Sequence, residues 1–104
     1  EVNIADIKGA IISADYEEEK RMVIILKELE ETRSLLIYDE QGDFIAEIVS
    51  PQGYTFVSLK NSDGNIMVVA QGTSDMTRDS FGRNDWNFVI DFENFYVQKK
   101  SITQ

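Results

Sequence analysis

The sequence predicts a mainly β protein, an antiparallel meander that closes into a sandwich or a barrel-like pair of sheets. Three observations predict this class. Short runs of β-branched and aromatic residues recur along the chain, clusters of turn residues separate them, and the turns come at regular intervals. The length of 104 residues, with no linker or low-complexity tract, indicates one domain over residues 1–104.

In the first half, strands are expected at residues 7–14, 22–26, 34–38 and 44–49. The segment 16–21 is then a hairpin loop between the first two strands. The segment 39–43, with the sequence Asp-Glu-Gln-Gly-Asp, is rich in turn-forming residues and separates the third strand from the fourth.

Residues 16–31 also allow a helix, which would make the fold α+β. Asp15 would cap this helix and Glu18 would complete a capping box. One helical face would bury Met22, Ile25, Leu26 and Leu29. We favour the strand, because the antiparallel meander then runs unbroken through the chain.

In the second half, strands are expected at residues 54–59, 66–70, 86–92 and 95–97. Asp63-Gly64 suits a tight hairpin turn, because both residues tolerate positive φ angles. The polar segment 71–85 is long for a loop in a compact domain, and such loops are usually functional or mobile.

The inward-facing positions of these strands give the expected core. Its members are bulky apolar residues: Ile12, Ile24, Leu26, Leu36, Tyr38, Phe44, Ile48, Phe56, Met67, Val69, Trp86, Phe88 and Ile90.

Charge is the most informative property of the composition. The net charge is −9, and residues 1–50 hold 13 acidic and 5 basic residues, against 6 and 5 in residues 51–104. A negative field repels phosphate and anionic lipid and attracts basic proteins. We therefore expect a basic protein partner, and neither nucleic acid nor membrane.

The residues present exclude several kinds of catalysis. Cysteine and histidine are both absent, so disulfides, thiolate sites and serine–histidine or cysteine–histidine arrangements cannot form. No glycine-rich phosphate motif occurs. Asp75, Asp79 and Asp85 share one loop but lack the spacing of a calcium loop, and Arg78 and Arg83 lie among them. We expect no cofactor, no metal and no enzymatic activity.

The candidate partner-binding residues are acidic clusters and two aromatic residues beside a charged loop. Trp86 suits either a core position or a binding anchor, and Phe81 lies in a polar segment where nothing else indicates core. The full set is Glu17, Glu18, Glu19, Glu30, Glu31, Asp75, Asp79, Phe81, Asp85 and Trp86.

The chain resembles the small acidic immunity proteins of bacterial toxin–immunity systems, including contact-dependent growth inhibition. The resemblance rests on its size, its charge of −9, the glutamates at 17–19 and 28–31, and the stretch Arg-Asn-Asp-Trp-Asn-Phe at 83–88. It implies a cytoplasmic, non-enzymatic inhibitor that covers the active site of a cognate basic toxin, often a nuclease. We expect a monomer. The alternative is a structural or accessory β-domain of a larger assembly, suggested by the blade-like rhythm of the hairpins.

Overall fold

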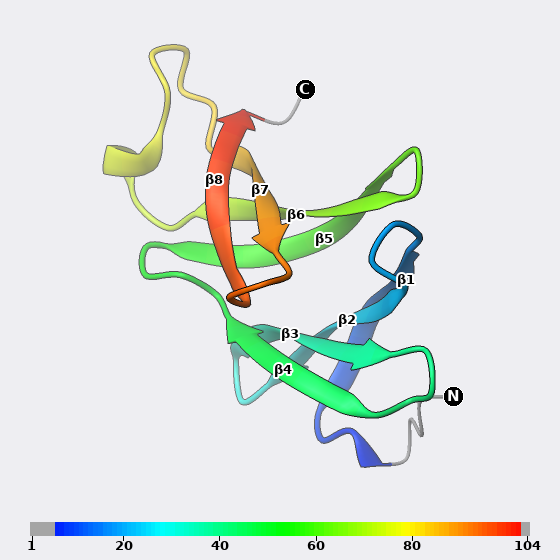
Figure 1. Ribbon diagram of the computed structural model, residues 1–104. Helices are drawn as coiled ribbons and strands as arrows, with labels where there is room; N and C mark the ends of the chain where they lie inside the picture. Colours follow the sequence, from blue (N-terminus) through cyan, green and yellow to red (C-terminus); the bar gives the residue numbers. More distant parts are fainter. Residues whose placement is uncertain (1–5, 103–104) are drawn as a thin grey trace.

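The computed structural model describes residues 6–102, which form eight antiparallel β-strands (Figure 1). The strands are β1 (Ala10–Glu17), β2 (Met22–Leu29), β3 (Thr32–Asp39), β4 (Phe44–Val49), β5 (Tyr54–Ser62), β6 (Asn65–Gly72), β7 (Asp85–Asp91) and β8 (Tyr96–Ile102). The domain prediction covers 1–104, and residues 1–5 and 103–104 lie outside the described residues.

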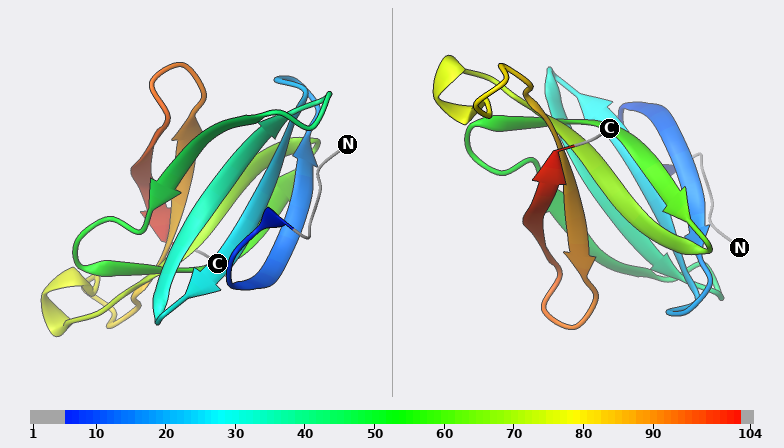
Figure 2. Two further views of the ribbon diagram at one scale, coloured as in Figure 1. Left: turned by 90° about the horizontal axis from the view of Figure 1, so that it is seen from below. Right: turned by 90° about the horizontal axis from the view of Figure 1, so that it is seen from above.

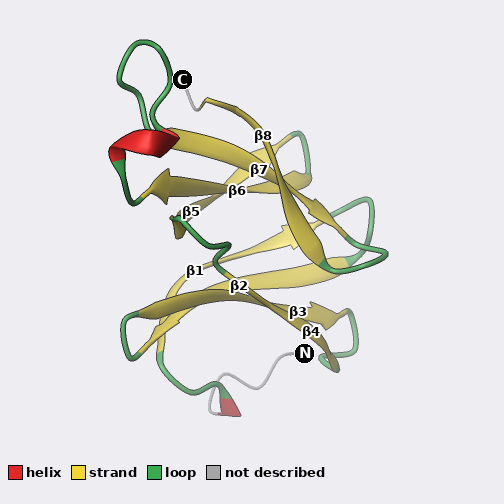
Figure 3. Cartoon of the chain, turned by 90° about the vertical axis from the view of Figure 1, so that its left-hand side faces the viewer, coloured by secondary structure: helices red, strands yellow, loops and turns green. Residues whose placement is uncertain are grey.

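The strands form two sheets of four, in the orders β1-β2-β3-β4 and β5-β6-β7-β8. The sheets lie one over the other (Figure 3), and residues 50–53 connect them. The prediction of a meander folded into a sandwich is confirmed. The barrel-like variant is wrong, since the two sheets do not close on each other. In Figure 2, the outer strands β1 and β8 lie on opposite sides of the molecule.

The helix considered for residues 16–31 is not formed, and the strand prediction is confirmed. β2 pairs with β3 from Met22 opposite Asp39 to Leu29 opposite Thr32. Ile24 and Leu26 point into the core, while Ile25 and Lys27 alternate with them and are buried too. β2 is thus buried on both faces, and its run of successive apolar residues imitates a helical face.

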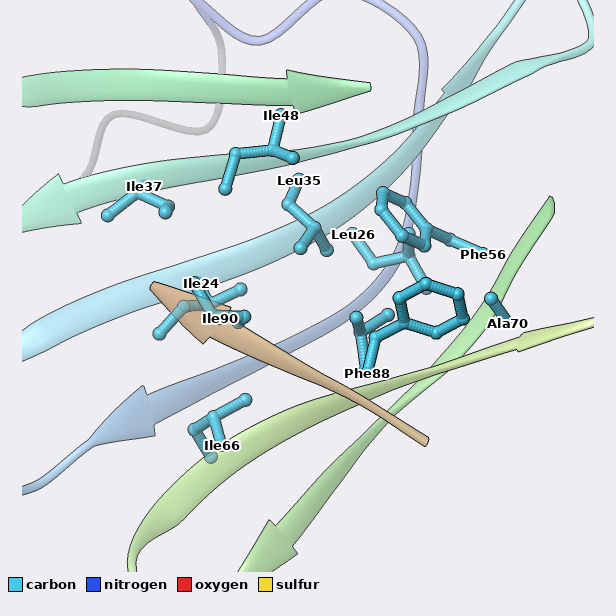
Figure 4. Close-up of a cluster of buried hydrophobic side chains, with 11 residues drawn as sticks. Ile24, Leu26, Leu35, Ile37, Ile48, Phe56, Ile66, Ala70, Phe88 and Ile90 are labelled. Atoms are coloured by element: carbon cyan, nitrogen blue, oxygen red, sulfur yellow. The ribbon is translucent and has the colours of Figure 1, made fainter. Parts of the chain in front are cut away.

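The core lies between the sheets and takes alternate residues from six strands (Figure 4). Four of its side chains come from the neighbouring strands β2 and β3. The buried members are Ile24, Leu26, Leu35, Ile37, Ile48, Phe56, Ile66, Val68, Ala70, Phe88 and Ile90. Burial of apolar surface at about 25 cal/mol per Å² makes this cluster the main source of stability.

Two predicted core residues are wrong. Ile12 is 39% exposed and Phe44 is 57% exposed. Both lie on edge strands at irregularities in register, and such irregularities break the alternation of inward and outward side chains on which the prediction depends. Leu36 and Val69 are buried but lie outside the central cluster, and the side chains of Tyr38, Met67 and Trp86 are only partly buried.

Two hairpins turn through two residues that both have positive φ angles. Asp63 and Gly64 adopt φ values of 55° and 90°, as their sequence predicts. Glu30 and Glu31 adopt 52° and 65°, a conformation that glutamate rarely takes. The backbone of the turn between β2 and β3 is therefore strained, and its two residues carry like charges.

Candidate functional site

The structure divides the predicted binding residues between two ends of the molecule (Figure 1). Glu17, Glu18 and Glu19 lie where β1 turns into β2, whereas Glu30 and Glu31 lie at the far end of β2. The remaining five residues belong to the loop after β6 or to the start of β7, away from the turn at 63–64 that precedes β6. A single partner-binding surface therefore does not contain all ten.

Three turns meet at the end that carries Glu18 and Glu19. The hydroxyl of Tyr16 donates to Glu40 at 2.6 Å, and Arg21 lies 3.9 Å from the same carboxylate, so the β1–β2 and β3–β4 loops are joined. The backbone N–H of Glu18 donates to the carbonyl of Gly64 at 2.9 Å, which adds the β5–β6 turn. Loops distant in sequence thus form one surface.

We call this surface the acidic end. Its segments 15–21, 39–43 and 63 hold eight acidic and two basic residues. The two cations, Lys20 and Arg21, already lie within 4.0 Å of glutamates. The carboxylates that reach its surface are Asp15, Glu18, Glu19, Asp39, Glu40, Asp43 and Asp63. The hydrogen bond to Glu40 raises the pKa of Tyr16 above its ordinary value.

Glu17 is only 2% exposed and does not reach this surface. Its carboxylate accepts the backbone N–H of Ile66 at 2.6 Å and the side-chain amide of Asn65 at 2.8 Å. A buried carboxylate with hydrogen bonds on both oxygens is held by the fold. The prediction that Glu17 contacts a partner is therefore withdrawn, since its side chain joins the two sheets.

A pocket of about 310 Å³ adjoins the acidic end. Its apolar lining comes from β6, β7 and the residue after β7: Ile66, Met67, Val89, Ile90 and Phe92. Its polar lining comes from the end of β1, the β1–β2 loop, the ends of the β5–β6 hairpin and β8: Glu17, Glu19, Lys20, Ser62, Asn65 and Lys100. No pattern in the sequence indicates this pocket, because its walls come from four separate segments.

The loop at residues 73–84 is held by its own hydrogen bonds. The buried side chain of Asn84 donates to the carbonyls of Gly72 and Ser74, and accepts from the Thr77 hydroxyl at 2.7 Å. A side chain at Gly72 would collide with Thr77 and Asn84. The loop is therefore an ordered part of the fold.

Asp79 organises the tip of this loop. Its carboxylate accepts the backbone N–H groups of Phe81 and Arg83 and the Arg83 guanidinium. Burial tends to raise the pKa of Asp79, but these donors together outweigh it and hold the pKa below the ordinary value. Asp75 is paired with Arg78 at 2.9 Å. Both aspartates thus serve the loop itself.

The two predicted aromatic anchors differ in exposure. Phe81 is 81% exposed and lies against the Arg83 guanidinium. Met76 on the same loop, which no motif in the sequence marks, is 95% exposed. Trp86 instead packs against the core, donates its indole N–H to the carbonyl of Thr77, and is covered by Lys99 at 4.3 Å. Of the two readings of Trp86, the packing favours a core residue.

Comparison with protein-family models, curated proteins and solved structures found no match to this chain. Within residues 6–102, no helix is long and apolar enough to cross a membrane. The same part of the chain contains no group of three or more acidic residues placed to hold a metal ion.

Proposed function

We propose that this protein is a non-enzymatic inhibitor that binds a basic protein partner through the acidic end. In this proposal the partner is a cognate toxin with nuclease activity, and the protein is its immunity protein. The observation that carries the proposal is the convergence of three turns whose segments hold eight acidic and two basic residues.

The electrostatics support a basic partner. A nuclease must be positively charged where it holds phosphate, so clustered carboxylates complement that cleft. Glu18, Glu40 and Asp43 are exposed and can approach a partner without any change in the fold. Such contacts should weaken with salt, because the Debye length falls from about 10 Å at 0.1 M to about 3 Å at 1 M.

The test uses charge reversal at the acidic end, with a matched reversal at the opposite end. One variant carries Glu18→Lys and Asp43→Lys; the control carries Glu30→Lys and Glu31→Lys, so both change the net charge by the same amount. Each is immobilised with the unmodified protein and used to capture partners from a lysate of the source organism. A basic protein retained by the unmodified protein and the control, but lost with the first variant, supports the proposal.

Inhibition is then measured on the captured protein. Its nuclease activity should fall to the background as the unmodified protein is added in equimolar amount. The acidic-end variant should need at least about tenfold more protein, because loss of steering slows association. Retention of the same partner by all three proteins would show that the acidic end is not the interface.

The alternative, an accessory β-domain of a larger assembly, is favoured by one observation. Phe44 and Val49 are 57% and 58% exposed on the edge strand β4, and exposed apolar edges pair with other chains. This candidate predicts self-association through β4. Light scattering at rising concentration would show oligomers that Val49→Lys abolishes; a monomer at every concentration would contradict self-association through β4 and count against this candidate.

A further inference from the structure

We infer that the pocket beside the acidic end receives one apolar side chain of aromatic size from the basic partner. In the partner, this residue is flanked by lysine or arginine, which the surrounding carboxylates bind. The inference rests on the proposed function and specifies how the partner is recognised. It adds to the charged surface a contact that salt does not screen.

The lining of the pocket suits an apolar group. Ile66 and Ile90 are almost fully buried at its inner side, and Val89 and Phe92 are partly exposed to it. When an apolar group covers apolar surface that is open to water, the free energy falls and binding is favoured. A volume of about 310 Å³ is at the lower limit for small-molecule sites, which run from ~300 to 1,000 Å³, and suits a side chain better than a whole cofactor.

The charges around the pocket argue against an ionic occupant. Glu19 and Lys20 lie 4.0 Å apart and balance each other. Lys100 forms no ion pair within residues 6–102, so it repels a cationic side chain that enters. An anionic group is opposed by the carboxylates of the neighbouring turns. A neutral apolar group in the pocket, with cations outside it, satisfies both constraints.

The pocket is already formed in the free protein. The hydrogen bonds of Glu17 to Asn65 and Ile66 fix the β1–β2 loop beside β6. Gly64 lets the loop approach, since a Cβ there would lie 2.9 Å from the Glu18 side chain. A preformed site lowers the cost of ordering on binding, which is how a single anchor residue contributes strongly to affinity.

The test uses two capped pentapeptides, each with two lysines on either side of a central residue. The central residue is tryptophan in one and serine in the other. Both are titrated into the isotopically labelled protein at low salt, and backbone amide shifts are recorded. Both should shift the amides of Glu18 and Glu40. The tryptophan peptide alone should shift Ile66, Val89 and Ile90, and should bind at least tenfold more tightly.

A substitution at the rim blocks the pocket without touching the core. Ser62 is exposed and lines the pocket, so Ser62→Trp places an indole over its mouth. Ser80→Trp is the matched control, because Ser80 is exposed in the loop at the opposite end. Circular dichroism verifies that both variants are folded. The tenfold advantage of the tryptophan peptide should vanish in Ser62→Trp and persist in Ser80→Trp.

The outcomes separate this inference from the proposed function. Equal binding of both peptides, with shifts confined to the acidic end, overturns the pocket inference and leaves the charged interface intact. A tryptophan advantage that survives Ser62→Trp places the anchor elsewhere and also overturns it. Binding of neither peptide at low salt contradicts both the pocket inference and the charge attraction on which the proposed function rests.

Discussion

The carboxylate of Glu17 accepts the backbone N–H of Ile66 at a distance of 2.6 Å, across 49 positions of sequence. This bond ties the end of β1, in the first sheet, to the start of β6, in the second. The other oxygen of Glu17 holds the side-chain amide of Asn65 at 2.8 Å. One acidic residue in a run of three is therefore part of the interior, while its two neighbours face solvent.

Glu17→Ala should destabilise the protein by about 3 kcal/mol, because a charge-assisted hydrogen bond is lost and the buried N–H of Ile66 keeps no acceptor. Urea unfolding followed by circular dichroism measures this change. Glu18→Ala is the control and should change the free energy of unfolding by less than about 0.5 kcal/mol, since Glu18 is exposed. Equal effects of the two substitutions would show that Glu17 does not join the sheets.

Asn84→Ala should release the loop at residues 73–84, because this side chain holds the carbonyls of Gly72 and Ser74. We expect faster trypsin cleavage after Arg78 and Arg83, and a loss of about 1–3 kcal/mol from the buried groups left unpaired. Limited proteolysis read by mass spectrometry tests this. The control is Asp85→Ala, at an exposed neighbouring position, which should be cleaved at the rate of the unmodified protein. If Asn84→Ala is also cleaved at that rate, the Asn84 side chain does not hold the loop.

Replacing Glu30-Glu31 by Asn-Gly should stabilise the protein. Both glutamates have positive φ angles, which cost about 1–2 kcal/mol per residue outside glycine and asparagine, and Asn-Gly is a preferred pair for this turn. The midpoint of urea unfolding should rise by an amount equivalent to about 1–2 kcal/mol, with an unchanged slope. Asp63→Asn, in a turn that already has a favourable pair, should have little effect. A lower midpoint for the Asn-Gly variant would show that no strain is stored there.

The strands could be predicted from sequence because local patterns determine them. The runs at 44–49 and 54–59 are rich in β-branched and aromatic residues, and turn residues bound them. The Asp63-Gly64 turn follows from the same local chemistry. Only β2 was ambiguous, since Ile24 and Ile25 are buried on opposite faces and hide the alternation.

The candidate site could be predicted only in part, because burial depends on contacts between distant segments. Nothing in the Glu17–Glu19 run distinguishes the residue whose carboxylate meets β6 from the two that face solvent. The sequence at 39–43 predicts only a turn, and the bond from Tyr16 to Glu40 is what places its carboxylates beside the β1–β2 loop. The position of Phe44 on an edge strand likewise follows from strand order, which the residues around it do not encode.

Asp91→Asn should reduce the stability of the protein at neutral pH but not in strong acid. The backbone N–H groups of Asn94 and Glu93 donate to the Asp91 carboxylate and hold its pKa below the ordinary value of 3.8. A carboxyl whose pKa is lower in the folded state stabilises the fold above its unfolded pKa, and that contribution disappears as the pH falls through the folded pKa. Asparagine keeps an oxygen acceptor for the same turn but carries no charge. The difference in melting temperature between the two proteins should therefore be largest near pH 7 and close progressively below about pH 4. Thermal melts by circular dichroism from pH 7 to acid measure it, and a difference that stays constant with pH would mean that the charge of Asp91 does not stabilise the β7–β8 loop.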